Sequence, residues 1–384
     1  MKEILDKIEL KHFISNDGFL KSKYPDDKNS INSKNMQIAY NTISNWKNYQ
    51  PSKLINLEKI SKKCGVKKIY YKDESSRFNL GSFKALGGAY AIYNLISKLK
   101  KRCIDSSKIV VTTATDGNHG RSVAWGAKIA GCKCKIYIHA HVSKFREEAM
   151  KDLGADVIRI SGNYDESLNQ CKKDAKKNSW YIVSDTSWSG YKDIPIQVMA
   201  GYSVIAKEIS MQIQNEKPTH IFLPIGVGGL AAAITSFFWK EMQEELCKII
   251  SVESEFSPCL MESILNKKPK IYEIVNETMM AGLSCGEVSE VAWKILKPTL
   301  SFCTTISDNA VGPLMKFLSE GGGGNTKIEA GECSTSGLAS FLGIWKNNSL
   351  KKKIGLNKDS IILLIGTEGA TDRNFYNQMI KNSY

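Results

Sequence analysis

The sequence predicts an α/β protein with two doubly wound parallel-sheet domains and a ligand cleft between them. Apolar, strand-like runs alternate with helical segments in a first series between about residues 67 and 185. A second series begins near Tyr202, and the apolar run SIILLIG at 360–366 closes the pattern. Strands that alternate with helices form parallel sheets covered on both faces, and two such units place a ligand site between them.

The elements can be assigned in order from hydrophobic periodicity and from glycines that end helices. The first series has strands at 67–73, 108–115, 134–140, 156–161 and 180–185 and helices at 84–99, 121–131, 145–154 and 164–178. The second has a helix from about 202, a strand at 219–225, a helix at 230–242 and strands at 248–254 and 360–366. In the helix that follows Lys84, apolar residues recur at spacings of four and three, which predicts one buried face.

Composition excludes several classes of protein. The 384 residues suffice for two domains, and 42% hydrophobic with 24% charged residues is typical of soluble globular proteins. The net charge of +14 does not predict nucleic-acid binding, because the lysines are scattered and arginines, which read bases, are few. The arginines are Arg77, Arg102, Arg121, Arg146, Arg159 and Arg373.

The run from 221 to 239 carries no charge and is long enough to span a bilayer. Pro224 and three glycines interrupt it, so a buried strand, a glycine loop and a core helix explain it better than a membrane span. The N-terminal residues alternate charged and apolar side chains, which predicts no secretory signal. Ten dispersed cysteines without a CxxC pair predict no metal site and fit a reducing cytoplasm. We interpret His139 and His141 as surface strand residues.

The loop PIGVGGLAAA joins a predicted strand to a helix start through Gly226, Gly228 and Gly229. Such a loop can turn sharply and present backbone N–H groups to a phosphate. The same residues satisfy a G-x-G-x-x-A dinucleotide pattern, with Glu253 where a ribose-binding acid would lie. Tight packing alone is the third interpretation.

A second loop, TTATDGNHGRS, also joins a strand to a helix. It places Asp116, Asn118 and His119 at the carboxyl end of a strand, the edge that faces ligands in doubly wound sheets. The amide of Asn118 can hydrogen-bond a phenolate or carboxylate oxygen, and neighbouring N–H groups can hold a carboxylate. A dinucleotide enzyme has no need of this second site.

Lys84 lies among small and apolar residues in GSFKALGG, whereas most lysines of the chain lie in polar runs. Apolar surroundings predict a lowered pKa for this lysine and therefore more of the free amine that condenses with aldehydes. An amine of this kind beside a phosphate-binding loop indicates pyridoxal phosphate, held as a Schiff base.

The motifs SFK, GNHG and GxGG, in this order, resemble those of the fold-type II pyridoxal-phosphate enzymes, the tryptophan synthase β/threonine dehydratase group. The resemblance implies a large cofactor-binding domain at 1–85 and 191–384, a small α/β domain at 86–190, and a homodimer. It implies that Lys84 forms the Schiff base next to Phe83. The other implied cofactor contacts are Asn118 to the ring hydroxyl oxygen, Thr367 to the pyridine nitrogen, and Gly226, Val227, Gly228, Gly229 and Leu230 to the phosphate.

Within this group, KDESSRFNLGSFKALGGAYA, TDGNHGR, MAGLSCGE and TEGATD resemble segments of the diaminopropionate ammonia-lyases. This implies the α,β-elimination of D- or L-2,3-diaminopropionate to pyruvate and two ammonia molecules. A threonine or serine dehydratase of the same fold and a catalytically inactive protein that binds the cofactor or an amino acid stay open as alternatives.

The resemblance also implies catalytic roles. Lys84 is the base for the L-isomer, and the carboxylate of Asp116, on or near the opposite face, takes the proton of the D-isomer. Asp185 lies near the substrate amino group, with a helix N-cap or a loop turn as its alternative role. The substrate site further includes Ser82, Gly117 and His119.

Two cysteines adjoin motif segments that are characteristic of the resemblance. Cys259 and Cys285 could approach each other near the cleft mouth, and a disulfide between them is a hypothesis that thiol counting would test. Free thiols are the alternative, because a reducing cytoplasm opposes disulfides.

Overall fold

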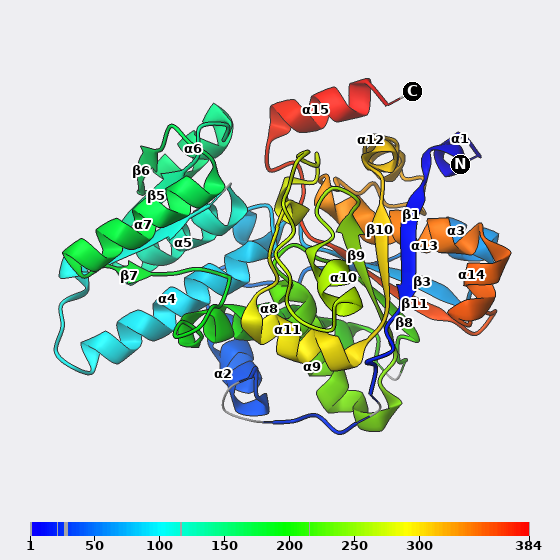
Figure 1. Ribbon diagram of the computed structural model, residues 1–384, viewed down its shortest axis with the longest axis horizontal. Helices are drawn as coiled ribbons and strands as arrows, with labels where there is room; N and C mark the ends of the chain where they lie inside the picture. Colours follow the sequence, from blue (N-terminus) through cyan, green and yellow to red (C-terminus); the bar gives the residue numbers. More distant parts are fainter. Residues whose placement is uncertain (1, 21, 27–29, 116, 215, 384) are drawn as a thin grey trace.

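The computed structural model describes residues 2–20, 22–26, 30–115, 117–214 and 216–383 (Figure 1). Its first half contains α1 (Lys2–Lys7), β1 (Leu10–Ser15), α2 (Ser33–Ile43), β2 (Lys53–Asn56), α3 (Glu58–Cys64), β3 (Lys68–Asp73), α4 (Lys84–Lys100), β4 (Val110–Ala114), α5 (Asn118–Ala130), β5 (Lys133–Ile138), α6 (Lys144–Lys151), β6 (Asp156–Arg159), α7 (Tyr164–Asn178) and β7 (Tyr181–Ile182). Its second half contains α8 (Asp193–Gln212), β8 (His220–Pro224), α9 (Gly229–Met242), β9 (Lys248–Ser254), α10 (Cys259–Leu265), α11 (Glu290–Thr299), β10 (Leu300–Ile306), α12 (Val311–Ser319), α13 (Ser336–Trp345), α14 (Asn348–Lys353), β11 (Ile361–Gly366) and α15 (Arg373–Lys381).

The four-stranded sheet has the order β6-β5-β4-β7, and all its strands are parallel. Figure 1 shows it with α5, α6 and α7 on one side of the molecule. The local sequence explains its helices well. α5 ends at Gly131, which has a left-handed backbone (φ 70°), and α7 begins with a capping box between Asn163 and Glu166.

The seven-stranded sheet has the order β1-β10-β9-β8-β11-β3-β2. Its five central strands are parallel, and four of them (β9, β8, β11 and β3) were predicted, but β1 pairs with β10 and β2 with β3 in antiparallel fashion. We did not predict β10 or the two edge strands β1 and β2. The two edge strands are partly exposed, and neither has more than two consecutive apolar residues.

α8 begins at Asp193, about nine residues before the predicted start near Tyr202. Pro195 lies in its first turn, where the missing backbone N–H breaks no helical hydrogen bond. The uncharged run at 221–239 becomes the buried strand β8, a glycine loop and the core helix α9, as predicted. Among the described residues, no helix is long and apolar enough to cross a membrane.

α4 connects the two sheet units, because it packs against α5 on one side and against α8 on the other. Its buried face includes the apolar residues predicted from their spacing: Ala85, Ala89, Ile92, Ile96 and Leu99. The domain boundary predicted at residue 85 falls in the first turn of this helix and stays a prediction. The two sheets therefore meet around the N-terminus of α4, where Lys84 lies.

Candidate active site

The residues before Lys84 lie beside the end of β11. Ser82 forms an isolated antiparallel bridge with Glu368, and the backbone N–H of Phe83 donates to the carbonyl oxygen of Thr367 at 3.0 Å. Lys84 is then the first residue of α4. The predicted Schiff-base lysine and the predicted pyridine-nitrogen ligand Thr367 thus come from adjacent segments, although 283 positions separate Lys84 and Thr367 in the sequence.

Lys84 forms an ion pair with Asp185, whose carboxylate accepts a hydrogen bond from the Lys84 ammonium. Both side chains are largely buried, with 21% and 14% of their surface exposed. Burial lowers the pKa of Lys84, but the Asp185 carboxylate and the nearby Tyr202 outweigh burial and raise the pKa above its ordinary value. Our prediction of a lowered pKa was wrong, because Asp185 is remote in sequence and supplies the compensating charge.

Asp185 lies three residues after β7, at the carboxyl edge of the four-stranded sheet. Burial would raise its pKa, but the charge of the Lys84 ammonium beside it holds the pKa below its ordinary value. The carboxylate is therefore ionised. The predicted alternative role as a helix N-cap does not apply to α8, whose N-cap is Lys192.

His119 completes this group of side chains. Its Nε2 lies 2.8 Å from the carbonyl oxygen of Val183, which can only accept, so Nε2 carries the proton. Burial lowers the pKa of His119, and Nδ1 lies 3.9 Å from Oδ2 of Asp185 without a hydrogen-bond partner among the described residues. A neutral imidazole thus presents a free lone pair next to the Asp185 carboxylate.

The glycine loop lies next to the same group. A Cβ atom on Gly229 would lie 3.7 Å from the carbonyl oxygen of Asp185, and Gly228 has a left-handed backbone (φ 88°). A Cβ atom on Gly226 would lie only 2.5 Å from the carbonyl oxygen of Gly282, so only glycine fits there. Backbone N–H groups in the first turn of a helix have no helical acceptor, and those of α9 start at this loop. The loop therefore has the features of a phosphate site.

Glu253 decides against the dinucleotide interpretation. Its carboxylate accepts hydrogen bonds from the backbone N–H groups of Leu260 at 2.7 Å and Met261 at 2.9 Å, and its side chain is fully buried. Burial raises the pKa of Glu253 to about 8 although these two hydrogen bonds oppose the shift. The residue holds the start of α10 and is not available to bind a ribose.

The predicted ring ligand Asn118 is the first residue of α5, and its amide donates a hydrogen bond to Oε2 of Glu368. Glu368 follows Thr367 at the end of β11. This contact brings the carboxyl edge of the four-stranded sheet against that of the seven-stranded sheet. Asn118, Thr367 and Lys84 are therefore brought into one region.

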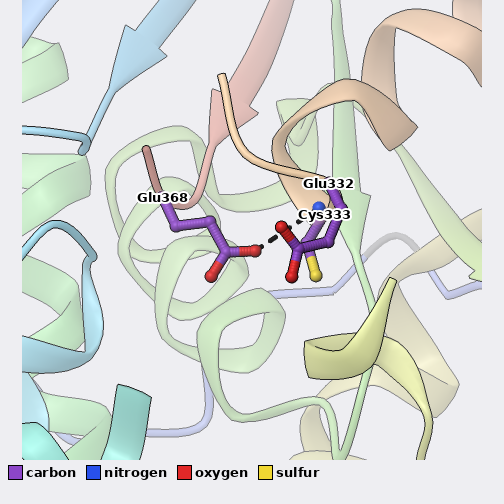
Figure 2. A group of neighbouring side chains, drawn as sticks. All are labelled: Glu332, Cys333 and Glu368. Carbon is purple, nitrogen blue, oxygen red and sulfur yellow. Dashed lines mark hydrogen bonds between the residues drawn. The ribbon is translucent and has the colours of Figure 1, made fainter. Parts of the chain in front are cut away.

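Glu368 also belongs to a buried cluster that the sequence did not reveal. Figure 2 shows Glu332, Cys333 and Glu368 with their side chains close together, and the backbone N–H of Cys333 donates to Oε1 of Glu368 at 3.4 Å. Arg146 of α6 approaches Glu332 at 3.1 Å. Burial, and next the charge on Glu368, raise the pKa of Glu332 to about 8. The guanidinium and these hydrogen bonds already engage the carboxylates, so we do not interpret the cluster as a metal site.

A second unpredicted cluster lies before Lys84. Glu208 of α8 binds Lys72 of β3 at 2.6 Å and Arg77 at 2.8 Å, and Arg77 also binds Glu74 at 2.8 Å. All four side chains are buried. The cluster fixes the segment between β3 and Lys84 to α8. The motif KDESSRF contains three of these residues, but nothing local in the sequence pointed to Glu208.

Asp116 lies outside the residues that the structure describes. Cys259 and Cys285 lie on either side of Gly226: the Cys259 thiol lies 3.7 Å from the Gly226 carbonyl oxygen, and the Cys285 sulfur would lie 3.1 Å from a Cβ there. The disulfide between them stays a prediction.

A comparison with known families decides the class of this site. The family model described as "Pyridoxal-phosphate dependent enzyme" matches residues 46–366. The chain belongs to this family. Pyridoxal-phosphate-dependent enzymes use pyridoxal 5'-phosphate as cofactor. The N–H groups of the glycine loop fit its phosphate, and the amine of Lys84, next to this loop, fits its aldehyde.

Individual relatives of this pyridoxal-phosphate-dependent enzyme agree with the match. Diaminopropionate ammonia-lyase of Escherichia coli K12 is 34% identical over 350 residues, which cover 86% of this chain and 87% of the relative. The Escherichia coli enzyme in complex with D-serine has a TM-score of 0.89 and 31% identity, with 97% of each chain covered. Its complex with an aminoacrylate-PLP azomethine reaction intermediate has a TM-score of 0.88 and 32% identity, again with 97% coverage of each chain. The predicted family, fold class and cofactor are confirmed.

Proposed function

We propose that this chain is an ammonia-lyase that converts 2,3-diaminopropionate and water to pyruvate and two molecules of ammonia. The observation that carries the proposal is the ionised, largely buried carboxylate of Asp185 at the Lys84 amine. Once Lys84 is covalently bound to the cofactor, it is no longer a primary ammonium. The Asp185 carboxylate then favours a cationic group of the substrate, and diaminopropionate has a second ammonium where serine and threonine have a hydroxyl.

The residues that would hold the cofactor come from both sheet units. Lys84 would bind its aldehyde, with Phe83 alongside, and Asn118 and Thr367 would bind the ring hydroxyl oxygen and the ring nitrogen. The loop at 226–230 would bind the phosphate. Bound there, the cofactor supplies an electron sink that stabilises negative charge at the substrate Cα.

The chain's own groups would move the protons. The Lys84 amine, released by the substrate, lies on one face and takes the Cα proton of the L-isomer. The carboxylate of Asp116, which we place on or near the opposite face from the sequence alone, takes that of the D-isomer. The two bases together would make the enzyme indifferent to the configuration at Cα.

Other groups would bind the substrate. Asp185 would hold its ammonium group, and the unprotonated Nδ1 of His119, 3.9 Å from that carboxylate, would accept a second hydrogen bond from the same ammonium. Ser82 and the backbone of Gly117 would bind at the carboxylate side. In our proposal these groups bind the amino and carboxylate groups of the substrate, which both isomers have, so the D- and the L-isomer can both bind.

A product assay tests the proposal. The purified holoenzyme would be given D- and L-diaminopropionate, D- and L-serine and L-threonine, and 2-oxo acid and ammonia would be measured. We expect kcat/KM for at least one diaminopropionate isomer to exceed that for serine and threonine by at least about a hundredfold, with two ammonia molecules per pyruvate. A preference for serine or threonine would identify a dehydratase. Cofactor absorbance without any turnover would identify a binding protein.

We also propose that the enzyme works as a homodimer in a reducing cytoplasm. The ten cysteines are dispersed along the sequence without a CxxC pair, a pattern that fits a reducing compartment. Sedimentation of the holoenzyme and thiol counting with and without reductant test the two statements.

A further inference from the structure

Tyr202 is a residue of α8, and its side chain packs against the first turn of α4, near Lys84. Its side chain is 1% exposed, and its ring meets the Phe83 ring edge-on with 4.8 Å between centroids. A Cβ atom on Gly87, one turn after Lys84, would lie 2.6 Å from Cζ of Tyr202, the ring carbon that bears the hydroxyl. Glycine at 87 thus allows the hydroxyl end of Tyr202 to approach the face of α4 that carries Lys84.

The Tyr202 hydroxyl is buried and has no hydrogen-bond partner among the described residues. Burying a hydroxyl in this way costs free energy, which a phenylalanine of the same shape would avoid. Buried polar groups without a partner call for an explanation, and a partner that arrives during function is one. Burial raises the pKa of Tyr202 above its ordinary value, so the hydroxyl is neutral and can both donate and accept.

The charged groups that act on this hydroxyl are Lys84 and Asp185. In the structure, Asp185 binds the Lys84 ammonium. The Tyr202 hydroxyl is a second group that the same amine could bind. We propose that Tyr202 is a positioning residue that hydrogen-bonds the amine of Lys84 after an amino-acid substrate has released it from the cofactor. The proposal rests on the proposed function, because it requires Lys84 to bind the cofactor.

Tyr202 and Asp185 would then bind two different amino groups. With the amine held by Tyr202, the Asp185 carboxylate is left for the ammonium of the substrate. The amine also keeps a fixed position from which to take a proton of the L-isomer. Proton removal from the D-isomer, which we assign to Asp116, does not require this hydrogen bond.

Tyr202→Phe tests the proposal with little change of shape. Tyr90→Phe is the matched control, because Tyr90 is 1% exposed and lies on α4 away from Lys84. Each holoenzyme would be titrated with D-serine, and the change in cofactor absorbance would report the release of Lys84. We expect the half-saturating D-serine concentration to rise by about threefold to tenfold in Tyr202→Phe and not in the control. In turnover, kcat for L-diaminopropionate should fall by a similar factor while kcat for the D-isomer changes less than about twofold.

The outcomes separate this proposal from the proposed function. Identical titrations and identical L/D ratios for wild type and Tyr202→Phe would overturn the role of Tyr202 and leave the ammonia-lyase assignment intact. A higher melting temperature for Tyr202→Phe with unchanged titration would show that the hydroxyl only costs stability, which also overturns the role. A wild-type enzyme that responds neither to D-serine nor to diaminopropionate would contradict the proposed function itself.

Discussion

Lys84 and Asp185, 101 residues apart in the sequence, form an ion pair where the carboxyl edges of the two sheets meet. Lys84 starts α4, which packs on both sheet units, and Asp185 follows the last strand of the four-stranded sheet. The Asp185 carboxylate raises the pKa of Lys84 and so keeps the lysine protonated, although burial lowers this pKa. In our proposal, the same carboxylate binds the ammonium of the substrate when Lys84 is bound to the cofactor.

Asp185→Asn should therefore change Lys84 and the substrate site together. Without the carboxylate, burial dominates, so the pKa of Lys84 should fall. The pH at which the cofactor-free chain captures pyridoxal phosphate at half its maximal rate should fall with it. Turnover of diaminopropionate should fall by about a hundredfold. Asp174→Asn, at a carboxylate on α7 that binds Tyr137, is the control. An unchanged capture profile in Asp185→Asn would refute the coupling.

Asp116→Asn should affect the two isomers unequally. Loss of a general base costs about a hundredfold or more, so kcat for the D-isomer should fall by at least that factor. The L-isomer depends on Lys84 and should keep most of its rate. Steady-state kinetics with both isomers measures the ratio, and equal losses would remove the two-base proposal.

Glu332→Gln should protect the protein at alkaline pH. The folded pKa of Glu332, about 8, lies above the ordinary value of 4.5, so the folded protein holds this proton more tightly than the unfolded chain. The stability that this proton supplies is complete below pH 4.5 and is lost as the pH rises through 8. Glutamine does not titrate, so the melting temperature of the variant relative to wild type should rise by at least about 2 °C between pH 6 and pH 9. A pH-independent difference would contradict this account.

Glu208→Leu should be strongly destabilising. It leaves Lys72 without its carboxylate partner and removes one of the two carboxylates that bind Arg77, in surroundings where none of these side chains reaches solvent. Breaking a buried ion pair in this way costs about 3–5 kcal/mol. Glu241→Gln, at the exposed pair with Lys240, should cost less than about 1 kcal/mol. Thermal melting of the two holoenzymes compares them, and equal losses would show that the buried cluster contributes no more than a surface pair.

Local patterns predicted much of the fold because the relevant physics is local. The α7 bounds and the β9 bounds match the predicted 164–178 and 248–254, since a capping box marks the start of α7 and the β-branched apolar residues Ile249, Ile250 and Val252 indicate the strand β9. The glycine loop at 226–230 was predictable for the same reason. The edge strands β1 and β2 were not, because their pairing depends on partners elsewhere in the chain.

The site was predictable in its residue types but not in its electrostatics. Lys84, Asn118 and the glycine loop were found from motifs, and the structure brings them together. The sign of the Lys84 pKa shift depends on Asp185, and the state of Glu332 depends on Glu368 and Arg146, which come from other segments. No periodicity or spacing encodes such contacts between segments.

The most direct test of the central claim is to locate the cofactor on the chain. The holoenzyme would be reduced with borohydride, which fixes the link between an amine and the pyridoxal phosphate aldehyde, and digested for peptide mass spectrometry. We predict a phosphopyridoxyl group on Lys84 alone, and none after Lys84→Ala, which should also lack the yellow colour and all turnover. A stable label on another lysine, with Lys84 unmodified, would contradict the account.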